Sequence, residues 1–251
     1  MTGPVVGVVC ALRSEARHLG RRVYGQGLVQ AVAPGTLRVV SGMGGTLAAA
    51  GAERLIAAGA GALVSWGLAG GLDPELPVGL IFLPSEILAP DGALLATDTP
   101  WRERLAAALG RFSPLASGRL VTSVAAVGTV AAKAALFKRS GARAVDMESA
   151  SVAQVARSRD LPFLAIRVII DRAVDVLPDS LLAAIGAGGE FSLWRLLAHL
   201  ARSPAELAPF VRLARTHSQA NRSLAAAAAS GALAPQQSVS LGTGPCTAGA
   251  S

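Results

Sequence analysis

The sequence predicts an α/β fold, a single-domain three-layer sandwich in which helices cover both faces of a central mixed, mainly parallel sheet. Two patterns predict this fold. Short apolar runs rich in β-branched residues are typical of strands buried on both faces, and they alternate with Ala-rich segments of helical length. With 251 residues, of which 52% are hydrophobic and 16% charged, the chain can bury a large core and is too apolar to be disordered throughout.

The expected elements alternate along the chain. They are strands at residues 5–11, 37–41, 62–66, 78–87, 119–123, 144–145 and 163–170, and helices at residues 46–58, 101–109, 130–139, 149–159, 180–185, 191–201 and 205–229. Ser14 is expected to cap a further short helix, and glycine turns are expected at residues 42–45 and 67–71. Right-handed crossovers would bring the carboxyl ends of the strands to one edge of the sheet, where open α/β sheets bind ligands.

The composition changes after residue 229. Residues 1–229 are expected to form one domain, since no linker or repeat divides them. Residues 230–251 are small, polar and interrupted by Gly and Pro, so they cannot bury enough apolar surface to fold. We expect them to form a flexible low-complexity tail.

The formal net charge of +7 is compatible with a nucleic acid or an anionic membrane as partner. The arginines are not interleaved with aromatic residues, so a nucleic-acid partner is not expected. Cys10 and Cys246 are too far apart in the sequence to suggest a disulfide framework, and no His, Cys or Asp cluster has metal-ligand spacing. The uncharged stretch at residues 55–72 is interrupted by glycines and favours a soluble, cytoplasmic protein over a membrane span.

Three of the few acids follow predicted strands directly. Glu15, Glu148 and Asp171 would therefore converge at one edge of the sheet, beside the glycine turns. Glycine lets the backbone approach a ligand closely and leaves N–H groups free to bind it. Taken singly, Glu15 and Glu148 could instead stabilise helix N-termini, and Asp171 could cap a turn.

A set of motifs carries a family resemblance over residues 5–175. The motifs are VGVVCALRSE at residues 6–15, SGMG at 41–44, GLAGGL at 67–72, VGLI at 78–81, AVDMESA at 144–150 and PFLAIRVIID at 162–171. In this order they resemble the nucleoside phosphorylase family, and within it the branch of methylthioadenosine/S-adenosylhomocysteine nucleosidases. The resemblance implies a nucleoside phosphorylase-like fold, an enzyme that cleaves purine N-glycosidic bonds to release adenine, and a homo-oligomer.

The resemblance also implies a role for each site residue. Asp171 would protonate purine N7, and Glu15 would act as base or positioner for the attacking water. Glu148 would accept hydrogen bonds from the ribose hydroxyls, Met147 would pack on the ribose face, and Arg167 would orient an acid. The other expected substrate-binding residues are Gly44, Leu68, Ala69, Gly70 and Val127.

The sequence departs from the family pattern at several positions. Leu68 and Ile170 stand where the family has serine, and the nearest candidates for phosphate-binding arginines are Arg13 and Arg38, of which Arg38 could instead face solvent. No cofactor is expected, although inorganic phosphate could be a co-substrate, and water and phosphate both remain open as the nucleophile. These changes make the expected pocket more apolar than a small polar nucleoside requires.

An apolar pocket fits one subgroup that later segments also resemble, the hopanoid-associated phosphorylases. The segments are DRA at residues 171–173, SLWRLL at 192–197 and residues 204–215. The implied substrate is adenosylhopane, a nucleoside-lipid. Phe191 and Trp194 could place residues 191–202 on an anionic inner-membrane surface, or this segment could be an ordinary docking helix. The alternatives are a general methylthioadenosine/S-adenosylhomocysteine nucleosidase and a non-catalytic nucleoside-binding protein.

Overall fold

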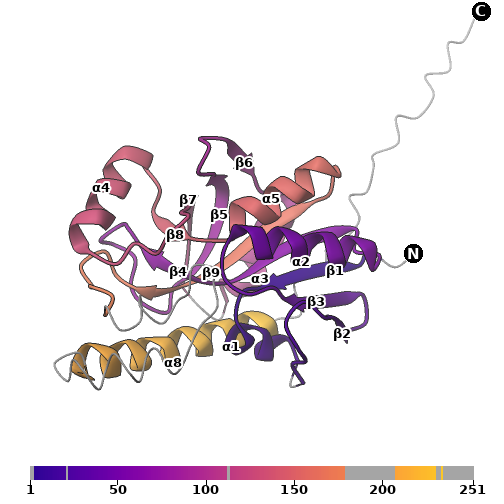
Figure 1. Ribbon diagram of the computed structural model, residues 1–251, viewed down its shortest axis with the longest axis horizontal. Coiled ribbons are helices and arrows are strands. Elements are labelled where there is room, and N and C mark those ends of the chain that lie inside the picture. The colour runs from indigo at the N-terminus through magenta and orange to yellow at the C-terminus, as the bar shows by residue number, and fades with distance from the viewer. Residues whose placement is uncertain (1–2, 21, 112–113, 179–206, 230–232, 234–251) are drawn as a thin grey trace, which may run out of the picture.

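A computed structural model describes residues 3–20, 22–111, 114–178, 207–229 and 233, and its centre is one mixed sheet (Figure 1). The strands are β1 (Val6–Cys10), β2 (Val29–Ala33), β3 (Thr36–Val40), β4 (Ala62–Gly71), β5 (Ile81–Leu88), β6 (Leu94–Ala96), β7 (Leu115–Thr122), β8 (Ala144–Asp146) and β9 (Phe163–Asp171). The helices are α1 (Arg13–Ala16), the short 3-10 helix η1 (Arg17–Leu19), α2 (Gly45–Ala57), α3 (Thr99–Leu109), α4 (Val130–Ser140), α5 (Ser149–Ser158) and α8 (Leu207–Ala229).

The strand order is β2-β3-β1-β4-β8-β7-β5-β6, and β9 pairs with both β4 and β5. Strands β4, β8, β7, β5 and β9 therefore form a closed circuit rather than one open sheet. The pairs β1–β3, β1–β4, β4–β9, β5–β7 and β7–β8 are parallel, whereas β2–β3, β4–β8, β5–β6 and β5–β9 are antiparallel. The prediction of an α/β sandwich with a mixed, mainly parallel sheet is confirmed.

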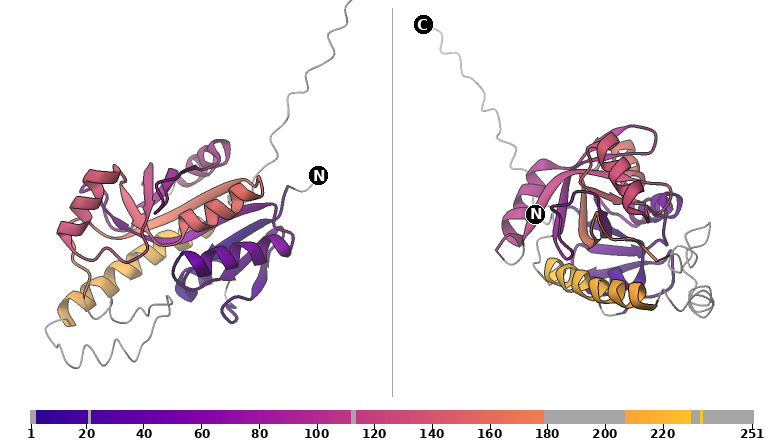
Figure 2. Two further views of the ribbon diagram at one scale, coloured as in Figure 1. Left: turned by 45° about the horizontal axis from the view of Figure 1, so that its top comes forward. Right: turned by 90° about the vertical axis from the view of Figure 1, so that its left-hand side faces the viewer.

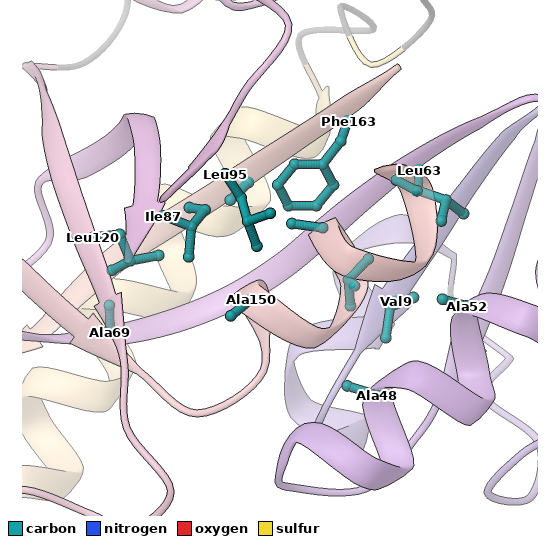
Figure 3. Packing of buried hydrophobic residues seen from close by; sticks show 14 of the residues in the cluster. Val9, Ala48, Ala52, Leu63, Ala69, Ile87, Leu95, Leu120, Ala150 and Phe163 are labelled. Carbon is teal, nitrogen blue, oxygen red and sulfur yellow. The ribbon is translucent and has the colours of Figure 1, made fainter. Parts of the chain in front are cut away.

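Two hydrophobic layers hold helices on opposite faces of the sheet. Helices α2 and α5 pack on one face in a cluster that includes Val9, Leu63 and Phe163 (Figure 3). Helices α1, α3 and α8 pack on the other face, where α3 contributes Trp101 and α8 contributes Leu224. Figure 2 shows the orange α8 running along the side of the sheet opposite α5. The burial of these side chains is the main force that stabilises the three layers.

Several boundaries differ from the sequence-based expectation. The predicted glycine turn at residues 67–71 is wrong, because β4 continues to Gly71 and pairs there with β8. Ser14 does not cap α1, because Leu12 occupies the N-cap position and Ser14 lies in the first turn. Strand β5 begins at Ile81, later than expected, and strands β2 and β6 were not predicted.

Helix α8 confirms most of the helix predicted at residues 205–229. The helices predicted at residues 180–185 and 191–201 lie outside the described residues, as does nearly all of the predicted tail at residues 230–251. Among the helices that the structure does describe, none combines the length and the apolar character needed to cross a membrane.

Candidate functional site

The three carboxylates predicted for the site, the catalytic Glu15 and Asp171 and the substrate-binding Glu148, lie at or just after the carboxyl ends of strands. Glu15 lies in α1, which follows β1; Glu148 follows β8, and Asp171 is the last residue of β9. Their exposed fractions are 4%, 8% and 4%, respectively, so all three are buried. Strand β4 runs beside them and carries the glycines that make room for Glu15 and Asp171.

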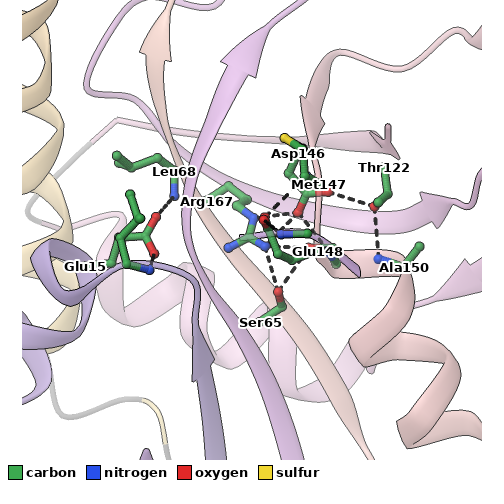
Figure 4. Close-up of polar contacts among 12 residues, drawn as sticks. Glu15, Ser65, Leu68, Thr122, Asp146, Met147, Glu148, Ala150 and Arg167 are labelled. Carbon is green, nitrogen blue, oxygen red and sulfur yellow. Dashed lines mark hydrogen bonds and ion pairs between the residues drawn. The ribbon is translucent and has the colours of Figure 1, made fainter. Parts of the chain in front are cut away.

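Glu15 is held by backbone N–H groups from two segments. Leu12 N donates to its Oε2 over 2.9 Å, and Leu68 N donates to its Oε1 over 3.1 Å (Figure 4). Burial raises the pKa of Glu15, although these N–H groups and Arg167 partly oppose the rise. A Cβ on Gly67 would lie 2.6 Å from Glu15 Oε1, so only glycine leaves space for the carboxylate here.

Glu148 is tied to the turn that precedes α2. Gly44 N donates to its Oε1 over 2.8 Å, and Met147 N donates to its Oε2 over 3.3 Å. Burial raises its pKa to about 7, repulsion from Asp146 adds to the rise, and Arg167 opposes it. A carboxyl group with this pKa changes charge near neutral pH, as carboxyl groups at catalytic sites often do.

Arg167 lies in the interior and pairs with Asp146, an acid that the sequence analysis did not single out. Its Nη2 is 2.7 Å from Asp146 Oδ2, and Nη2 also donates to Ser65 Oγ and Ser149 Oγ over 2.7 and 3.0 Å (Figure 4). Thr122 Oγ1 donates to the other oxygen of Asp146 over 2.7 Å. Burial lowers the pKa of Arg167, but the neighbouring carboxylates raise it more, so the guanidinium remains charged.

Asp171 has a partner that the sequence analysis also missed. Lys133 from α4 is fully buried, and its Nζ forms an ion pair with Asp171 Oδ2. The same ammonium donates to Arg172 O over 2.8 Å and to Asp175 O over 2.9 Å. Burial raises the pKa of Asp171, and Lys133 opposes the rise. A Cβ on Gly70 would lie 3.3 Å from Asp171 Oδ1, so β4 passes close to this carboxylate.

The sequence contains a signal for each of the two partners that were not predicted, Lys133 and Asp146. Lys133 shares a helical face with Leu136 and Ser140, which are both buried, and that spacing indicates an inward-pointing lysine. Arg167 lies in the middle of an apolar strand and needs an acid partner, and Asp146 ends a neighbouring predicted strand.

The other expected substrate-binding residues differ in accessibility. Met147, Leu68 and Gly70 are partly exposed, as is Gly44. The side chain of Ala69 instead packs in the core between the sheet and α5. Val127 is partly buried and packs against a small cluster that α4 helps to form.

The two candidates for a phosphate-binding arginine both donate to backbone carbonyls, but only Arg13 is exposed. The expectation that Arg38 could face solvent is wrong, because its side chain is fully buried. It donates to the carbonyl oxygens of Ala16, Gly20 and Arg22 and to the side-chain oxygen of Gln30. Arg13 donates to the carbonyl oxygens of Val23 and Tyr24.

Two histidines connect the segment after Glu15 to α8. His18 Nε2 lies 2.9 Å from Asn221 Oδ1, and Asn221 Nδ2 lies 2.9 Å from His217 Nδ1. These histidines therefore have a packing role at the junction of η1 and α8. In the described ranges, no group of three or more His, Cys, Asp or Glu side chains is arranged to hold a metal ion.

Solved structures of nucleosidases share this fold. The Neisseria meningitidis 5'-methylthioadenosine/S-adenosylhomocysteine nucleosidase in complex with methylthio-immucillin-A has 20% sequence identity and a TM-score of 0.65, covering 88% of this chain and 97% of that one. The futalosine hydrolase of Helicobacter pylori has 16% identity and a TM-score of 0.64, covering 88% and 96%. The Helicobacter pylori 5'-methylthioadenosine/S-adenosylhomocysteine nucleosidase has 19% identity and a TM-score of 0.61, covering 70% and 88%.

No curated protein matches the sequence. The family model described as the phosphorylase superfamily matches residues 33–212, which include Glu148, Arg167 and Asp171. That match covers more than half of the chain. The chain therefore belongs to the phosphorylase superfamily of nucleoside phosphorylases and nucleosidases, enzymes that cleave nucleoside N-glycosidic bonds.

Proposed function

We propose that this enzyme releases adenine from a purine nucleoside, with adenosylhopane as its substrate. The observation that carries the proposal is that Glu15, Glu148 and Asp171 are all buried carboxyl groups with raised pKa values. Glu15 and Asp171 lie against glycines of β4, and the charge of Arg167 acts on both Glu15 and Glu148. Clusters of buried carboxyl groups with raised pKa values are typical of sites that transfer protons.

The three acids would divide the chemistry of N-glycosidic cleavage. Asp171 would give a proton to purine N7, so that the base leaves as neutral adenine. The Glu148 carboxylate would accept hydrogen bonds from the ribose hydroxyls and stabilise the positive charge that develops on the ribose ring. Glu15 would position or deprotonate the nucleophile. Met147, next to Glu148 and partly exposed, would pack against the ribose.

Water is the nucleophile that the site favours. A phosphate ion needs cationic or hydroxyl donors, whereas Arg13 and Arg38 are bonded to backbone carbonyls. Leu68 has no side-chain donor, and its backbone N–H is bonded to Glu15. The proposal is therefore a hydrolase, with the phosphorylase as its alternative.

The lipid part of the substrate is supported by apolar residues near the acids. Leu68 and Ile170, which replace the family's serines, are both partly exposed. The backbone N–H of Leu68 is bonded to Glu15, and Ile170 directly precedes Asp171. A bulky hydrocarbon on the ribose C5′ would gain free energy from apolar contacts at about 25 cal/mol per Å² buried. A nucleoside with a short C5′ substituent, such as methylthioadenosine, is the second candidate.

Two further proposals concern the setting in which the enzyme acts. We propose that it forms a homo-oligomer, and that residues 191–202 touch the inner membrane from the cytoplasmic side. Sedimentation of the purified chain tests the first, and co-sedimentation with anionic vesicles tests the second, with a Trp194→Glu variant as control.

The decisive assay is chromatographic measurement of free adenine. Purified enzyme is incubated with adenosylhopane in detergent, with methylthioadenosine and with S-adenosylhomocysteine, each with and without phosphate. We expect release without phosphate and the highest kcat/KM on adenosylhopane. A preference for methylthioadenosine would overturn the lipid assignment, strict phosphate dependence would identify a phosphorylase, and no release from any substrate would indicate a non-catalytic protein.

A further inference from the structure

We infer that Lys133 is a positioning residue for Asp171: its ammonium fixes one carboxyl oxygen and stabilises the carboxylate that remains after the proton has moved to the base. The inference rests on the proposed function, in which Asp171 is the general acid. It adds to that function a residue from α4, outside every motif that suggested the site.

The surroundings of Lys133 fit a charged ammonium group. The side chain is fully buried, and its Nζ contacts Asp171 Oδ2, Arg172 O and Asp175 O. An ammonium group has three N–H donors, and these three acceptors satisfy all of them. A buried ammonium with a full set of partners is stable, whereas one that loses its carboxylate partner strongly destabilises the fold.

The ion pair leaves one oxygen of Asp171 for the substrate. Lys133 takes Oδ2, and no described residue donates a hydrogen bond to Oδ1. An added Cβ on Gly70, which is partly exposed, would lie 3.3 Å from Oδ1 and 3.7 Å from Oδ2, so Oδ1 is the nearer oxygen to β4. The carboxyl group therefore cannot rotate freely, and Oδ1 is the oxygen that would carry the acidic proton.

The proton and electron balance of the step is simple. The Oδ1–H bond of Asp171 breaks as the N7–H bond of adenine forms, and the electron pair of the glycosidic bond passes to the purine. Asp171 is left as a carboxylate, with the positive charge of Lys133 at its other oxygen. Because the product of the transfer is the charged form, Lys133 would make Asp171 a stronger acid.

Burial and the nearby charges act in opposite directions on Asp171. Burial raises its pKa, Lys133 lowers it and Asp175 raises it again. The carboxylate of Asp175 is itself bonded to the Arg172 guanidinium, 3.0 Å away. Lys133 is therefore the cation that directly opposes the effect of burial, and its removal should raise the pKa of Asp171 further.

If Lys133 had a purely structural role, its replacement would have different effects on the enzyme. Lys133 also ties the turn at residues 172–175 to α4, so its loss would loosen this turn whatever Asp171 does. Loosening alone would lower stability or raise KM. Loosening would also let water reach Asp171 and so lower its pKa, whereas loss of the Lys133 charge would raise it. The direction of the shift in a pH titration therefore separates the two roles.

The experiment compares Lys133→Met with Lys133→Arg, which keeps the charge, and with Lys138→Met, an exposed position on the same helix. If Lys133→Met does not fold, Lys133→Gln replaces it, because its amide can still donate to the two carbonyls without a charge. The first readout is the Asp171 carboxyl titration by ¹³C NMR, which needs no substrate. We expect its midpoint to rise by about one pH unit or more in the uncharged variants and to stay near wild type in the other two.

The second readout is the pH profile of adenine release. Because the protonated acid is the active form, kcat falls as pH rises through the pKa of Asp171. In Lys133→Met we expect this fall at higher pH and a maximal kcat lower by about tenfold or more, with KM little changed. An unchanged NMR midpoint, or a loss confined to KM, would overturn the inference. Absence of adenine release by the wild type would overturn the proposed function instead, and the NMR titration would still decide whether Lys133 controls Asp171.

Discussion

The backbone N–H of Gly44 lies 2.8 Å from Oε1 of Glu148, although the two residues are 104 positions apart in the sequence. Gly44 has a φ of 92°, a left-handed conformation that favours glycine, and it immediately precedes α2. The turn before α2 therefore orients the carboxylate that would bind the ribose. This contact agrees with the expectation that Glu148 lies beside the glycine turn at residues 42–45, and it identifies the two atoms that meet.

Glu148→Gln should lower kcat/KM by about 100-fold or more, because an amide has no charge to stabilise the cationic ribose. The side chain keeps its size, so the variant should remain folded. Steady-state kinetics and thermal unfolding measure the two effects. Glu53→Gln, on the exposed face of α2, is the matched control and should leave both values unchanged. Equal activity of Glu148→Gln and wild type would exclude Glu148 from the reaction.

Gly67→Ala should lower activity by at least about tenfold and stability by about 1–3 kcal/mol. Its Cβ would lie 2.6 Å from Glu15 Oε1 and 3.0 Å from an Arg167 nitrogen, so both side chains would have to move. Gly25→Ala, whose Cβ would meet nothing nearer than 3.6 Å, is the control. Urea unfolding and kcat measure the result, and a fully active Gly67→Ala would show that the position of Glu15 is not critical.

Arg167→Met should destabilise the fold by about 3–5 kcal/mol, since it leaves Asp146 buried without its ion-pair partner. The pair Arg159–Glu53 offers the contrast: its nitrogen–oxygen distance is 3.2 Å and both side chains are about half exposed. Arg159→Met should therefore cost less than about 1 kcal/mol. Urea unfolding of both variants makes the comparison, and equal losses would contradict the assignment of Arg167 to a buried network.

The stability of the wild type should fall as pH rises from about 4.5 to about 7. Burial raises the pKa of Glu148 from 4.5 to about 7, so in this range the folded chain binds more protons at this group than the unfolded chain. The expected loss is up to about 3 kcal/mol. Unfolding free energies of wild type and Glu148→Gln across this range test it. The unfolding free energy of the wild type minus that of Glu148→Gln should fall as pH rises through this range. A difference that grows with pH would refute the prediction.

Elements with strong local signals were predictable from the sequence. The apolar runs of β1, β4 and β9 identified the central strands, and the acids that follow strands identified the candidate site. Strands β2 and β6 were missed because they pair at the two ends of the strand order and are short and mostly at least partly exposed, so neither forms an apolar run buried on both faces.

The parts of the site that the sequence did not predict depend on long-range contacts. Lys133 and Asp171 are 38 positions apart, and Arg167 meets Ser65 across 102 positions. Strand β4 continues through its glycines because β8 and β9 supply partners for them, which no local pattern encodes. The local sequence therefore predicted acids at the strand ends and an acid partner for Arg167, but it did not predict that Asp146 is that partner or that Lys133 accompanies Asp171.

Adenine release by Asp171→Asn tests the central claim most directly. The asparagine keeps the size of the side chain but cannot donate an acidic proton to N7, so kcat should fall by about 100-fold or more on every substrate that the wild type cleaves. Asp160→Asn, at an exposed residue with a φ of 51° that asparagine tolerates, should remain fully active. A folded Asp171→Asn that releases adenine at the wild-type rate would contradict the account.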